Sequence, residues 1–309
     1  MTVRVVKPGL FTTVQDRGRF GYAHLGISAA GAADTLSLRI ANLLVGNDKN
    51  APVLEMTLLG ATLEFEQRAI IAISGAACEC KAGLDPALAN TAVEVRAGTV
   101  LQCGSLVDGA RSYLAVQGGF DVPCIMGSAS TDIRGRFGGF EGRRLQSGDV
   151  LRIGEGGGPQ VRRLRAGALE LMGLAGPIRV TKGAQQDWFS PVTYAKLLAS
   201  KYVVSEQSDR AGLRLKGEPV SPREESQLLT DGIPLGAIQV PPDGQPIILF
   251  VDQQTTGGYP KIANVIAADM HRVGQLRPRD EVRFTEVSIA AAVEALREQE
   301  RWLKTILVA

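Results

Sequence analysis

Short apolar runs, separated by glycine, proline and aspartate, dominate the hydrophobic pattern of this chain. Runs of this kind, bounded by turn residues, are typical of buried strands. The runs that predict strands cover residues 53–58, 61–65, 69–74, 92–95, 100–103, 113–116 and 246–251. Because the chain has so many short strands and turns, we expect a mainly β protein with a few helices.

Three segments instead show the spacing of a helix. Apolar residues after Asp34 recur at helical spacing, so Asp34 is expected to cap a helix that ends near Gly46. Ser190 followed by a proline predicts the start of a helix over 190–199. The periodicity of 288–303 predicts a further helix that closes the chain and packs on the protein surface.

The second half of the chain faintly repeats the first. Residues 276–284 match 145–153 in their Leu, Asp, Arg and terminal apolar positions, and 248–258 echo 113–119. Both matches are about 130 residues apart, which indicates two related domains. Glycines at 154–159 and arginines at 162–165 predict a linker. The predicted division is an N-terminal domain over 1–158, a C-terminal domain over 166–286, and a helix within 287–309.

Composition narrows the class of protein. With 309 residues, of which 45% are hydrophobic, the chain is long enough for two domains with their own cores. Lys and Arg number 34 and Asp and Glu 32, so no charge excess predicts a nucleic-acid or membrane-surface partner. No apolar run approaches the length of a membrane span, and the first residues lack the apolar core of a signal peptide. We therefore expect a cytoplasmic protein.

The densest group of polar residues follows the strand predicted at 246–251. It consists of Asp252, Gln253, Gln254, Thr255, Thr256, Gly257, Gly258, Tyr259, Pro260 and Lys261. The two glycines allow backbone to approach a ligand closely, and the lysine provides a compact charge suited to an anionic or carbonyl oxygen. Two interpretations stay open at this point: a substrate site, or a polar turn held by its own hydrogen bonds.

Arginines and acids elsewhere form further candidate sites. The glycine-rich loop over 134–144 contains Arg134, Arg136, Arg143 and Arg144, which could cradle a phosphate or carboxylate, or could lie on a mobile surface loop. Neither a Walker A sequence nor a G-x-G-x-x-G after a strand occurs in the chain.

Acids near the N-terminus and within strands allow a structural and a functional interpretation. Asp16, with Arg17, Arg19 and Arg39, forms either a structural network or a polar site at the entrance of the helix that Asp34 caps. Glu55, inside an apolar strand, is expected to form a buried pair with an arginine rather than to act as a catalytic carboxylate. Asp209 and Arg210 are expected to form an ion-paired corner where a turn enters a strand.

The chain has four cysteines, Cys78, Cys80, Cys103 and Cys124, and two histidines. No C-x-x-C pair occurs, and the histidines have no ligand spacing relative to the cysteines. We expect the sulfurs of Cys78 and Cys80 to lie on opposite faces of a strand. Small buried apolar side chains are therefore the favoured interpretation over a zinc site or a catalytic thiol, and no metal site is predicted.

Several blocks of the chain, in order, resemble the KipA-like family, which is also called allophanate hydrolase subunit 2 or the carboxyltransferase domain A/B type. The blocks are 15–19, 31–34, 41–47, 54–55, 127–131, 208–213, 236–241 and 252–261. The resemblance covers nearly the whole chain. It implies two cyclophilin-like β-barrel domains in tandem, in agreement with the faint repeat.

The resemblance also implies an activity that needs partner chains. Free-standing bacterial members resemble the C subunit of an ATP-dependent 5-oxoprolinase, which opens 5-oxo-L-proline to L-glutamate together with an A subunit and a KipI-like B subunit. A related member is the carboxyltransferase half of urea carboxylase, which moves a carboxyl group from carboxybiotin to urea. A regulatory protein that binds a KipI-like partner is the third alternative.

Residue type and clustering suggest how the roles divide under the first alternative. Lys261, Asp252, Thr255 and Thr256 are the expected catalytic residues. The expected substrate-binding residues are Gln253, Gln254, Gly257, Gly258, Tyr259, Arg136, Arg143, Asp16, Arg19 and Asp34. ATP is consumed by the complex, and its binding site is left open between this chain and a partner. Biotin enters only under the carboxyltransferase alternative, on a separate carrier, because no Met-Lys pair occurs in this chain.

Overall fold

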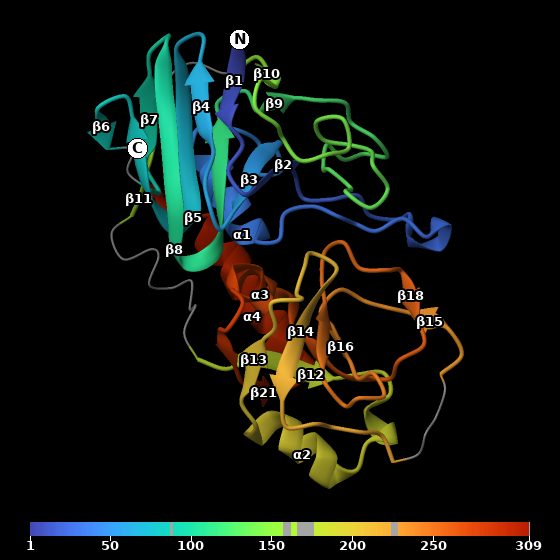
Figure 1. The fold of residues 1–309 in the computed structure, drawn as a ribbon. Coiled ribbons are helices and arrows are strands. Elements are labelled where there is room, and N and C mark those ends of the chain that lie inside the picture. Colours follow the sequence, from blue (N-terminus) through green and yellow to red (C-terminus); the bar gives the residue numbers. More distant parts are fainter. Residues whose placement is uncertain (87–88, 157–161, 166–175, 224–227, 309) are drawn as a thin grey trace. The chain divides into compact units, whose positions relative to one another are not determined.

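The computed structural model describes residues 1–86, 89–156, 162–165, 176–223 and 228–308. The chain forms two compact units. Unit 1 comprises Met1–Arg19, Ala30–Met172 and Leu303–Ala309, and unit 2 comprises Phe20–Ala29 and Gly173–Trp302. Figure 1 shows unit 1 as mainly strands, and unit 2 as strands together with helices. The predicted boundaries at 158 and 166 lie outside the described residues, as does the part of the predicted linker within 157–161.

Unit 1 contains a ten-stranded antiparallel sheet with the order β2-β3-β8-β4-β1-β10-β9, in which β5 also pairs with β6, β7 and β8. Its strands are β1 Thr2–Lys7, β2 Phe11–Gln15, β3 Val53–Thr57, β4 Thr62–Phe65, β5 Ala69–Ala82, β6 Asp85–Pro86, β7 Ala92–Val95, β8 Thr99–Val116, β9 Phe120–Asp121 and β10 Val150–Ile153. A separate pair joins β11 Arg163–Leu164 to β22 Leu307–Val308.

The prediction of two separate strands at 100–103 and 113–116 is wrong, because both segments belong to the single strand β8. Residues 99–102 of β8 pair with β4, and residues 111–114 pair with β3. The polar and glycine-containing stretch between them stays extended because it pairs with β5. One long strand therefore serves two neighbours, and Val14, Leu54, Leu63 and Leu114 meet in the core of unit 1.

Helix α1, Thr35–Leu44, packs its apolar side chains into unit 1. Its N-cap is Asp34, whose carboxylate accepts a hydrogen bond from Ser37 N at 2.9 Å. This confirms the predicted cap.

The expectation that the sulfurs of Cys78 and Cys80 lie on opposite faces of a strand is wrong. Both cysteines face the same side of β5, because positions i and i+2 of a strand share a face, and their Sγ atoms are 2.8 Å apart.

Unit 2 contains an eight-stranded sheet with the order β20-β13-β14-β17-β16-β19-β12-β21. Its strands are β12 Ile178–Lys182, β13 Tyr202–Val204, β14 Gly212–Gly217, β16 Ala237–Gln239, β17 Ile247–Leu249, β19 Lys261–Val265, β20 Glu281–Val282 and β21 Phe284–Glu286. Only Arg283 separates β20 from β21, yet these strands are the two ends of the order. The sheet must therefore curl until its ends meet, as in a barrel. The prediction of a mainly β chain with two barrel-like domains is confirmed.

Helices α2, α3 and α4 of unit 2 lie beside this sheet in Figure 1. The described helices of this unit are η1 Ala23–Leu25, η3 Gln186–Trp188, α2 Pro191–Ala199, η4 Ala267–Asp269, α3 Met270–Gln275 and α4 Ile289–Leu303. Ser190 caps α2 by accepting a hydrogen bond from Thr193 N at 2.9 Å, as predicted. The helix predicted at 288–303 corresponds to α4.

The faint repeat is visible in the backbone of two equivalent turns. Asp149 accepts a hydrogen bond from Gln146 N, and Asp280 accepts one from Arg277 N, each at 2.7 Å. The residue before each aspartate, Gly148 or Arg279, has a positive φ of 92° or 77°. The same turn thus precedes the final strands of each sheet, and the sequence match at 145–153 and 276–284 reflects a shared local structure.

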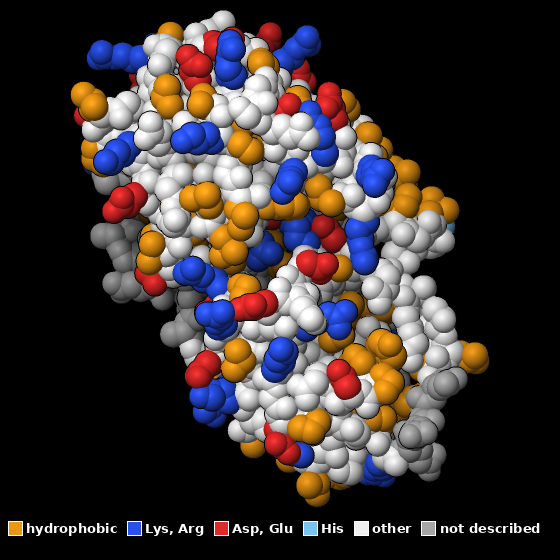
Figure 2. Space-filling model, in the orientation of Figure 1, with side chains coloured by type: hydrophobic (Ala, Val, Ile, Leu, Met, Phe, Trp, Pro, Cys, Tyr) orange, Lys and Arg blue, Asp and Glu red, His pale blue; other side chains and the backbone are white. Residues whose placement is uncertain are grey.

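Charges are mixed over the surface. On the face drawn in Figure 2, basic and acidic side chains are interspersed on both units. Within the described part of the chain, no helix combines the length and the apolar character that crossing a membrane would require.

Candidate functional site

The polar residues 252–261 form a loop of unit 2 that connects β17 to β19. Within this loop, Thr256 and Gly257 form strand β18, which pairs with β15, Asp231–Gly232. Ile233 N continues the pairing by donating a hydrogen bond to Thr255 O at 3.0 Å. We call this small two-stranded structure, residues 231–233 and 255–257, the ribbon. Gly257 suits its place there, because a Cβ at this position would lie 2.7 Å from Ile233 Cδ1.

Lys261 is buried at the start of β19, next to the ribbon. Its side chain is 2% exposed, and its Nζ donates to Asp231 Oδ2 at 2.7 Å and to Gly232 O at 3.3 Å. Its backbone N–H donates to Gln185 Oε1 at 3.1 Å. An ammonium has three donors, and these contacts take two of them.

The acid that balances Lys261 faces solvent. The Asp231 side chain is 51% exposed, and the hydrogen bond from Lys261 lowers the pKa of this carboxyl. A pair with one partner in water is held weakly, because water competes for the carboxylate. The ammonium can therefore exchange Asp231 for another oxygen more readily than a pair buried on both sides could.

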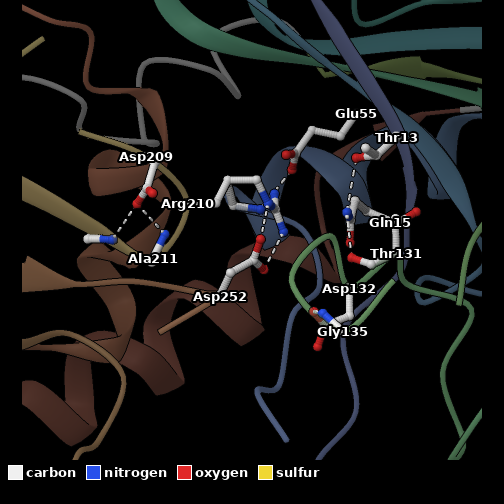
Figure 3. Close-up of polar contacts among 12 residues, drawn as sticks. Thr13, Gln15, Glu55, Thr131, Asp132, Gly135, Asp209, Arg210, Ala211 and Asp252 are labelled. Atoms are coloured by element: carbon white, nitrogen blue, oxygen red, sulfur yellow. Dashed lines mark hydrogen bonds and ion pairs between the residues drawn. The ribbon is translucent and has the colours of Figure 1, made fainter. Parts of the chain in front are cut away.

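Asp252, the first residue of the loop, is fixed by Arg210. Arg210 Nε lies 2.8 Å from Asp252 Oδ2 and Arg210 Nη2 lies 3.1 Å from Asp252 Oδ1, and both side chains are buried (Figure 3). Such a two-pronged contact is among the strongest of ion pairs. The corner predicted for Asp209 and Arg210 is built differently. Asp209 accepts hydrogen bonds from Ala211 N and Gly212 N, while Arg210 pairs with Asp252.

Two glutamines hold the loop, Gln253 by bonding to the ribbon and Gln239 by bonding to the loop from β16. Gln253 Nε2 donates to Ile233 O at 2.9 Å, and Gln239 Nε2 donates to Tyr259 O at 3.2 Å. The Oε1 atom of Gln253 is buried and accepts no hydrogen bond from the described residues. Since buried polar atoms nearly always have partners, this oxygen is suited to a donor on a ligand.

The other predicted residues of the loop lie closer to its surface. Gln254, Thr256, Gly258 and Tyr259 are exposed, and Thr255 is half-buried. Tyr259 is 44% exposed, so its ring is accessible to a ligand or partner. The structure therefore brings the predicted residues of unit 2 together on one loop, with Lys261 and Asp252 as its buried ends.

In unit 1, Asp16 and Arg19 meet the same short segment. Asp16 accepts hydrogen bonds from the hydroxyls of Ser128 and Ser130 and from Ala129 N. Arg19 donates to Ser130 O, and its guanidinium lies 4.6 Å from the centre of the Phe137 ring. Both predicted residues thus hold segment 128–130 against the end of β2.

Asp34 and Glu55 belong to a buried polar row across the sheet of unit 1. In the strand register, Thr13 pairs with Glu55 and Glu55 pairs with Tyr113. Glu55 Oε2 accepts from the Tyr113 hydroxyl at 2.7 Å and from Ala33 N at 2.8 Å, and Tyr113 also accepts from Asp34 N at 2.7 Å. Burial, followed by the nearby Glu55 carboxylate, raises the pKa of Tyr113.

The predicted pair of Glu55 with an arginine is present. Arg111 Nε lies 3.8 Å from Glu55 Oε1, and both side chains are buried. Asp34 serves this row and the N-terminus of α1 at once, because Ser37 N and the Ser37 hydroxyl both donate to it. These contacts give Asp34 and Glu55 a structural task in unit 1.

Next to this row lies a polar group that the sequence did not reveal. Gln15 Nε2 donates to Thr13 Oγ1 at 3.0 Å and to Thr131 O at 3.3 Å, and its Oε1 is buried without a donor among the described residues (Figure 3). Asp132, one residue further, accepts from Gly135 N at 2.7 Å. The available signal was the share of polar residues in β2, three of five, and all three are buried.

The arginine loop offers little for a phosphate. Arg143 is paired with Asp149 at 2.7 Å and with Glu141 at 2.6 Å, and the hydrogen bond from Arg143 to Asp149 is the main reason that its pKa is raised. Arg136 is exposed at a turn and has a positive φ of 56°. The structure does not bring these two guanidinium groups together through any described contact.

Asp231, Gln239 and Arg210 were missed as site residues. Gln239 had a signal, a glutamine within the apolar stretch 237–240, whose side chain is 2% exposed. Asp231 had none, because a short Asp-Gly sequence indicates only a turn. Its contact with Lys261 joins residues 30 positions apart and depends on the ribbon.

Comparisons with known proteins agree with this architecture. The family model described as "Carboxyltransferase domain, subdomain A and B" matches residues 25–286. The chain is 40% identical to the C subunit of 5-oxoprolinase from Escherichia coli, over 98% of this chain and 97% of that protein. It is 39% identical to the C subunit of 5-oxoprolinase from Haemophilus influenzae, over 95% of this chain and 94% of that protein.

The solved structure of the Kluyveromyces lactis urea carboxylase superposes on 98% of this chain with a TM-score of 0.91 and 32% identity. This chain corresponds to 29% of that protein. The two barrel-like units of this chain, its loop 252–261 and its buried row at Glu55 all lie within the span that it shares with the urea carboxylase. The chain therefore belongs to the family of the carboxyltransferase domain, subdomains A and B.

Proposed function

We propose that this chain is the C subunit of an ATP-dependent 5-oxoprolinase. In this role it would act with an A subunit and a KipI-like B subunit to open the lactam ring of 5-oxo-L-proline. The observation that carries the proposal is the 40% identity over 98% of the chain to a protein named as that subunit. The match is nearly end to end in both proteins, so its span includes the candidate site.

The geometry of the loop supports a lactam as substrate. A lactam presents a carbonyl oxygen, which accepts hydrogen bonds, and next to it an N–H, which donates one. The third N–H of the Lys261 ammonium can donate to the carbonyl oxygen, and Gln253 Oε1 can accept a hydrogen bond from the lactam N–H. Both side chains also donate to backbone carbonyls of the ribbon, Lys261 to Gly232 O and Gln253 to Ile233 O, so the ribbon positions a donor and an acceptor even when Asp231 is exchanged for the substrate.

Lys261 would stabilise the negative charge that develops on the carbonyl oxygen when water attacks the ring. A cation held in place in a buried position does this without reorganising as the reaction proceeds. Asp252 would act through Arg210 by fixing the start of the loop, and Thr255 and Thr256 would orient the ring from the ribbon. The exposed Tyr259 and Gln254 would contact the outer part of the substrate or a partner.

ATP supplies the phosphoryl group that activates the carbonyl in such a complex. The arginine loop of this chain does not fit a phosphate well, because Arg143 is already paired with two acids. We therefore derive no step on this chain through ATP, and place its binding on a partner chain.

The test is ATP-dependent release of glutamate from 5-oxo-L-proline by this chain alone, by its two partner chains alone, and by all three together. Turnover only in the complete mixture supports the proposal. Turnover by the two partner chains without this chain would contradict it.

Within the complete mixture, Lys261→Met is expected to lower kcat by about 100-fold or more, the usual cost of removing one charge-stabilising donor. Lys261→Arg should restore part of this loss, because it keeps the charge. Lys182→Met is the matched control, since Lys182 is an exposed residue on the neighbouring strand β12 and should leave kcat unchanged. Full turnover by Lys261→Met would show that the assignment of Lys261 is wrong.

The structural match to urea carboxylase favours one alternative function, the carboxyltransferase component of a biotin-dependent urea or amide carboxylase. The same loop would then bind the amide that accepts the carboxyl group. This function needs a separate biotin-bearing chain. Turnover of 5-oxo-L-proline by an assembly without such a chain would exclude it, whereas carboxylation of urea that depends on a biotinylated protein would support it.

A further inference from the structure

Three cysteines of unit 1 gather on two paired strands. Cys78 and Cys80 are on β5 and Cys103 is on β8, and these two strands run side by side along much of their length (Figure 1). The three Sγ atoms all lie within 4.8 Å of one another. This is the one group of three or more metal-ligating side chains of this kind within the described residues.

The sheet register explains why the sulfurs converge. Cys80 is directly opposite Cys103, and Cys78 shares the face of Cys80 two positions earlier. Between these pairs β5 advances by two residues while β8 advances by three, from Leu106 to Cys103. The resulting bulge changes the direction of β8 and brings Cys103 to the pair of sulfurs on β5.

The surroundings of the sulfurs are largely apolar. Cys80 and Cys103 are 6% and 5% exposed and belong to the core of unit 1, against which the half-buried Cys78 packs. Thiolates, and not thiols, are metal ligands.

We propose that Cys78, Cys80 and Cys103 form a three-thiolate site for a soft metal ion, and that Cu(I) is the ion it fits best. The site is separate from the proposed function and does not rest on it. Thiolate ligands select soft ions such as Cu(I) and zinc. Structural zinc sites almost always have four protein ligands, and this cluster has three among the described residues.

The distances are compatible with a bound ion. Three sulfurs about 2.3 Å from a metal, in one plane with it, are about 4 Å apart. The observed limit of 4.8 Å includes this value, and Cys78 and Cys80 would separate by about 1 Å through small changes of χ1. A disulfide accounts for the cluster less well, because it uses two of the three sulfurs and leaves the third without a partner.

The test is an anaerobic titration of the reduced, intact chain with Cu(I), in competition with a chromophoric Cu(I) chelator, and in parallel with Zn²⁺. We expect one Cu(I) per chain and the ultraviolet absorption of copper–thiolate bonds. Cys78→Ser should weaken Cu(I) binding at least about 100-fold. Cys124→Ser is the matched control and should change nothing, because Cys124 is exposed and outside the cluster.

A second measurement does not depend on variants, since Cys103→Ser could disturb the core. One equivalent of Cu(I) should protect three thiols of the native chain from alkylation and leave Cys124 reactive, as counted by mass spectrometry. Protection by Zn²⁺ and not by Cu(I), equal weakening by Cys124→Ser, or no binding of Cu(I) would each overturn the proposal. A disulfide between two of these thiols that persists under reducing conditions and prevents metal binding would also overturn the proposal.

Discussion

In unit 1 the buried acid Glu55 is enclosed by donors of its own sheet, whereas in unit 2 the buried base Lys261 is balanced by an acid that faces solvent. Glu55 accepts hydrogen bonds from Tyr113 and Ala33 N and pairs with Arg111, and both ionised side chains are buried. Lys261 is equally buried, but its partner Asp231 is half-exposed on the two-residue strand β15.

The difference concerns how easily each charge can change its partner. Releasing a donor from Glu55 would leave polar groups buried without partners, which is costly. When a substrate oxygen replaces Asp231 at Lys261, the carboxylate returns to water and the buried ammonium keeps a partner, so the exchange leaves no charge buried alone. The enclosed carboxylate is therefore suited to fixing the strands of unit 1, and the half-exposed pair is suited to exchange with a substrate. Three further predictions test this contrast in order of expected effect.

The largest effect is expected from Glu55→Ala. The variant removes the acceptor for Tyr113 and Ala33 N and leaves Arg111 without this buried carboxylate. Breaking a buried ion pair from one side typically costs about 3–5 kcal/mol, and we expect a loss in the free energy of unfolding in this range. Urea unfolding, followed by circular dichroism, measures it.

Glu64→Ala provides the control for Glu55. Glu64 is on β4, the next strand along the chain, and its side chain is 41% exposed in a pair with Arg4. Its loss should change the free energy of unfolding by no more than about 0.5 kcal/mol. Similar values for the two variants would mean that the enclosure of Glu55 has no energetic importance.

An intermediate effect is expected from Asp252→Asn. The amide keeps the shape of the side chain but removes the charge that balances Arg210, and we expect a loss of about 2–3 kcal/mol in the free energy of unfolding. The double variant Arg210→Met, Asp252→Leu should lose less free energy of unfolding than the sum of the losses of the single variants Arg210→Met and Asp252→Leu, because in the double variant neither charge is left buried alone. Additive losses would contradict the coupling between these residues.

The smallest effect is expected from Asp231→Asn, and it should depend on pH. Lys261 lowers the pKa of Asp231 in the folded chain, so the folded state binds this proton less readily than the unfolded state does. The resulting stability is present above the unfolded pKa of about 3.9 and is lost as the pH falls through the lower, folded pKa. The variant should lack this part of the acid-induced loss.

The midpoints of urea unfolding of the native chain and of Asp231→Asn measure this difference when they are followed from neutral pH down to the acid limb, the range below about pH 4 in which stability falls. In the Lys261→Met background, Asp231→Asn should no longer change the acid limb, because the cation that lowers the pKa is gone. An unchanged acid limb for Asp231→Asn in the native background would show that the pair with Lys261 is not formed in solution.

Local sequence signals predicted much of the fold. Asp34 and Ser190 were recognised as helix caps because a capping side chain bonds to backbone only three residues ahead. The matching turns at Asp149 and Asp280 were visible as a repeat for the same reason, since each turn is made within a few residues. The buried partner of Glu55 was predicted as a type of residue, but Arg111 itself was not.

The candidate site was predicted in part. The sequence brought together 252–261, because these residues are consecutive, and marked Lys261 and Asp252 as its charged ends. It paired Arg210 with its neighbour Asp209, although Arg210 contacts Asp252 in the structure. It also placed the sulfurs of Cys78 and Cys80 on opposite faces, although they are on the same face.

The sequence by itself determined the class of fold, the caps, the repeated turn and the polar loop, since each depends on residues close together in the chain. Only the tertiary structure decided the partners of the charges: Asp231 for Lys261, Asp252 for Arg210, and Cys103 for the two sulfurs on β5. These contacts join residues on different strands, and they depend on strand order and register. A shift of one residue in register turns every side chain to the other face of a sheet, so no local pattern can specify which charges meet.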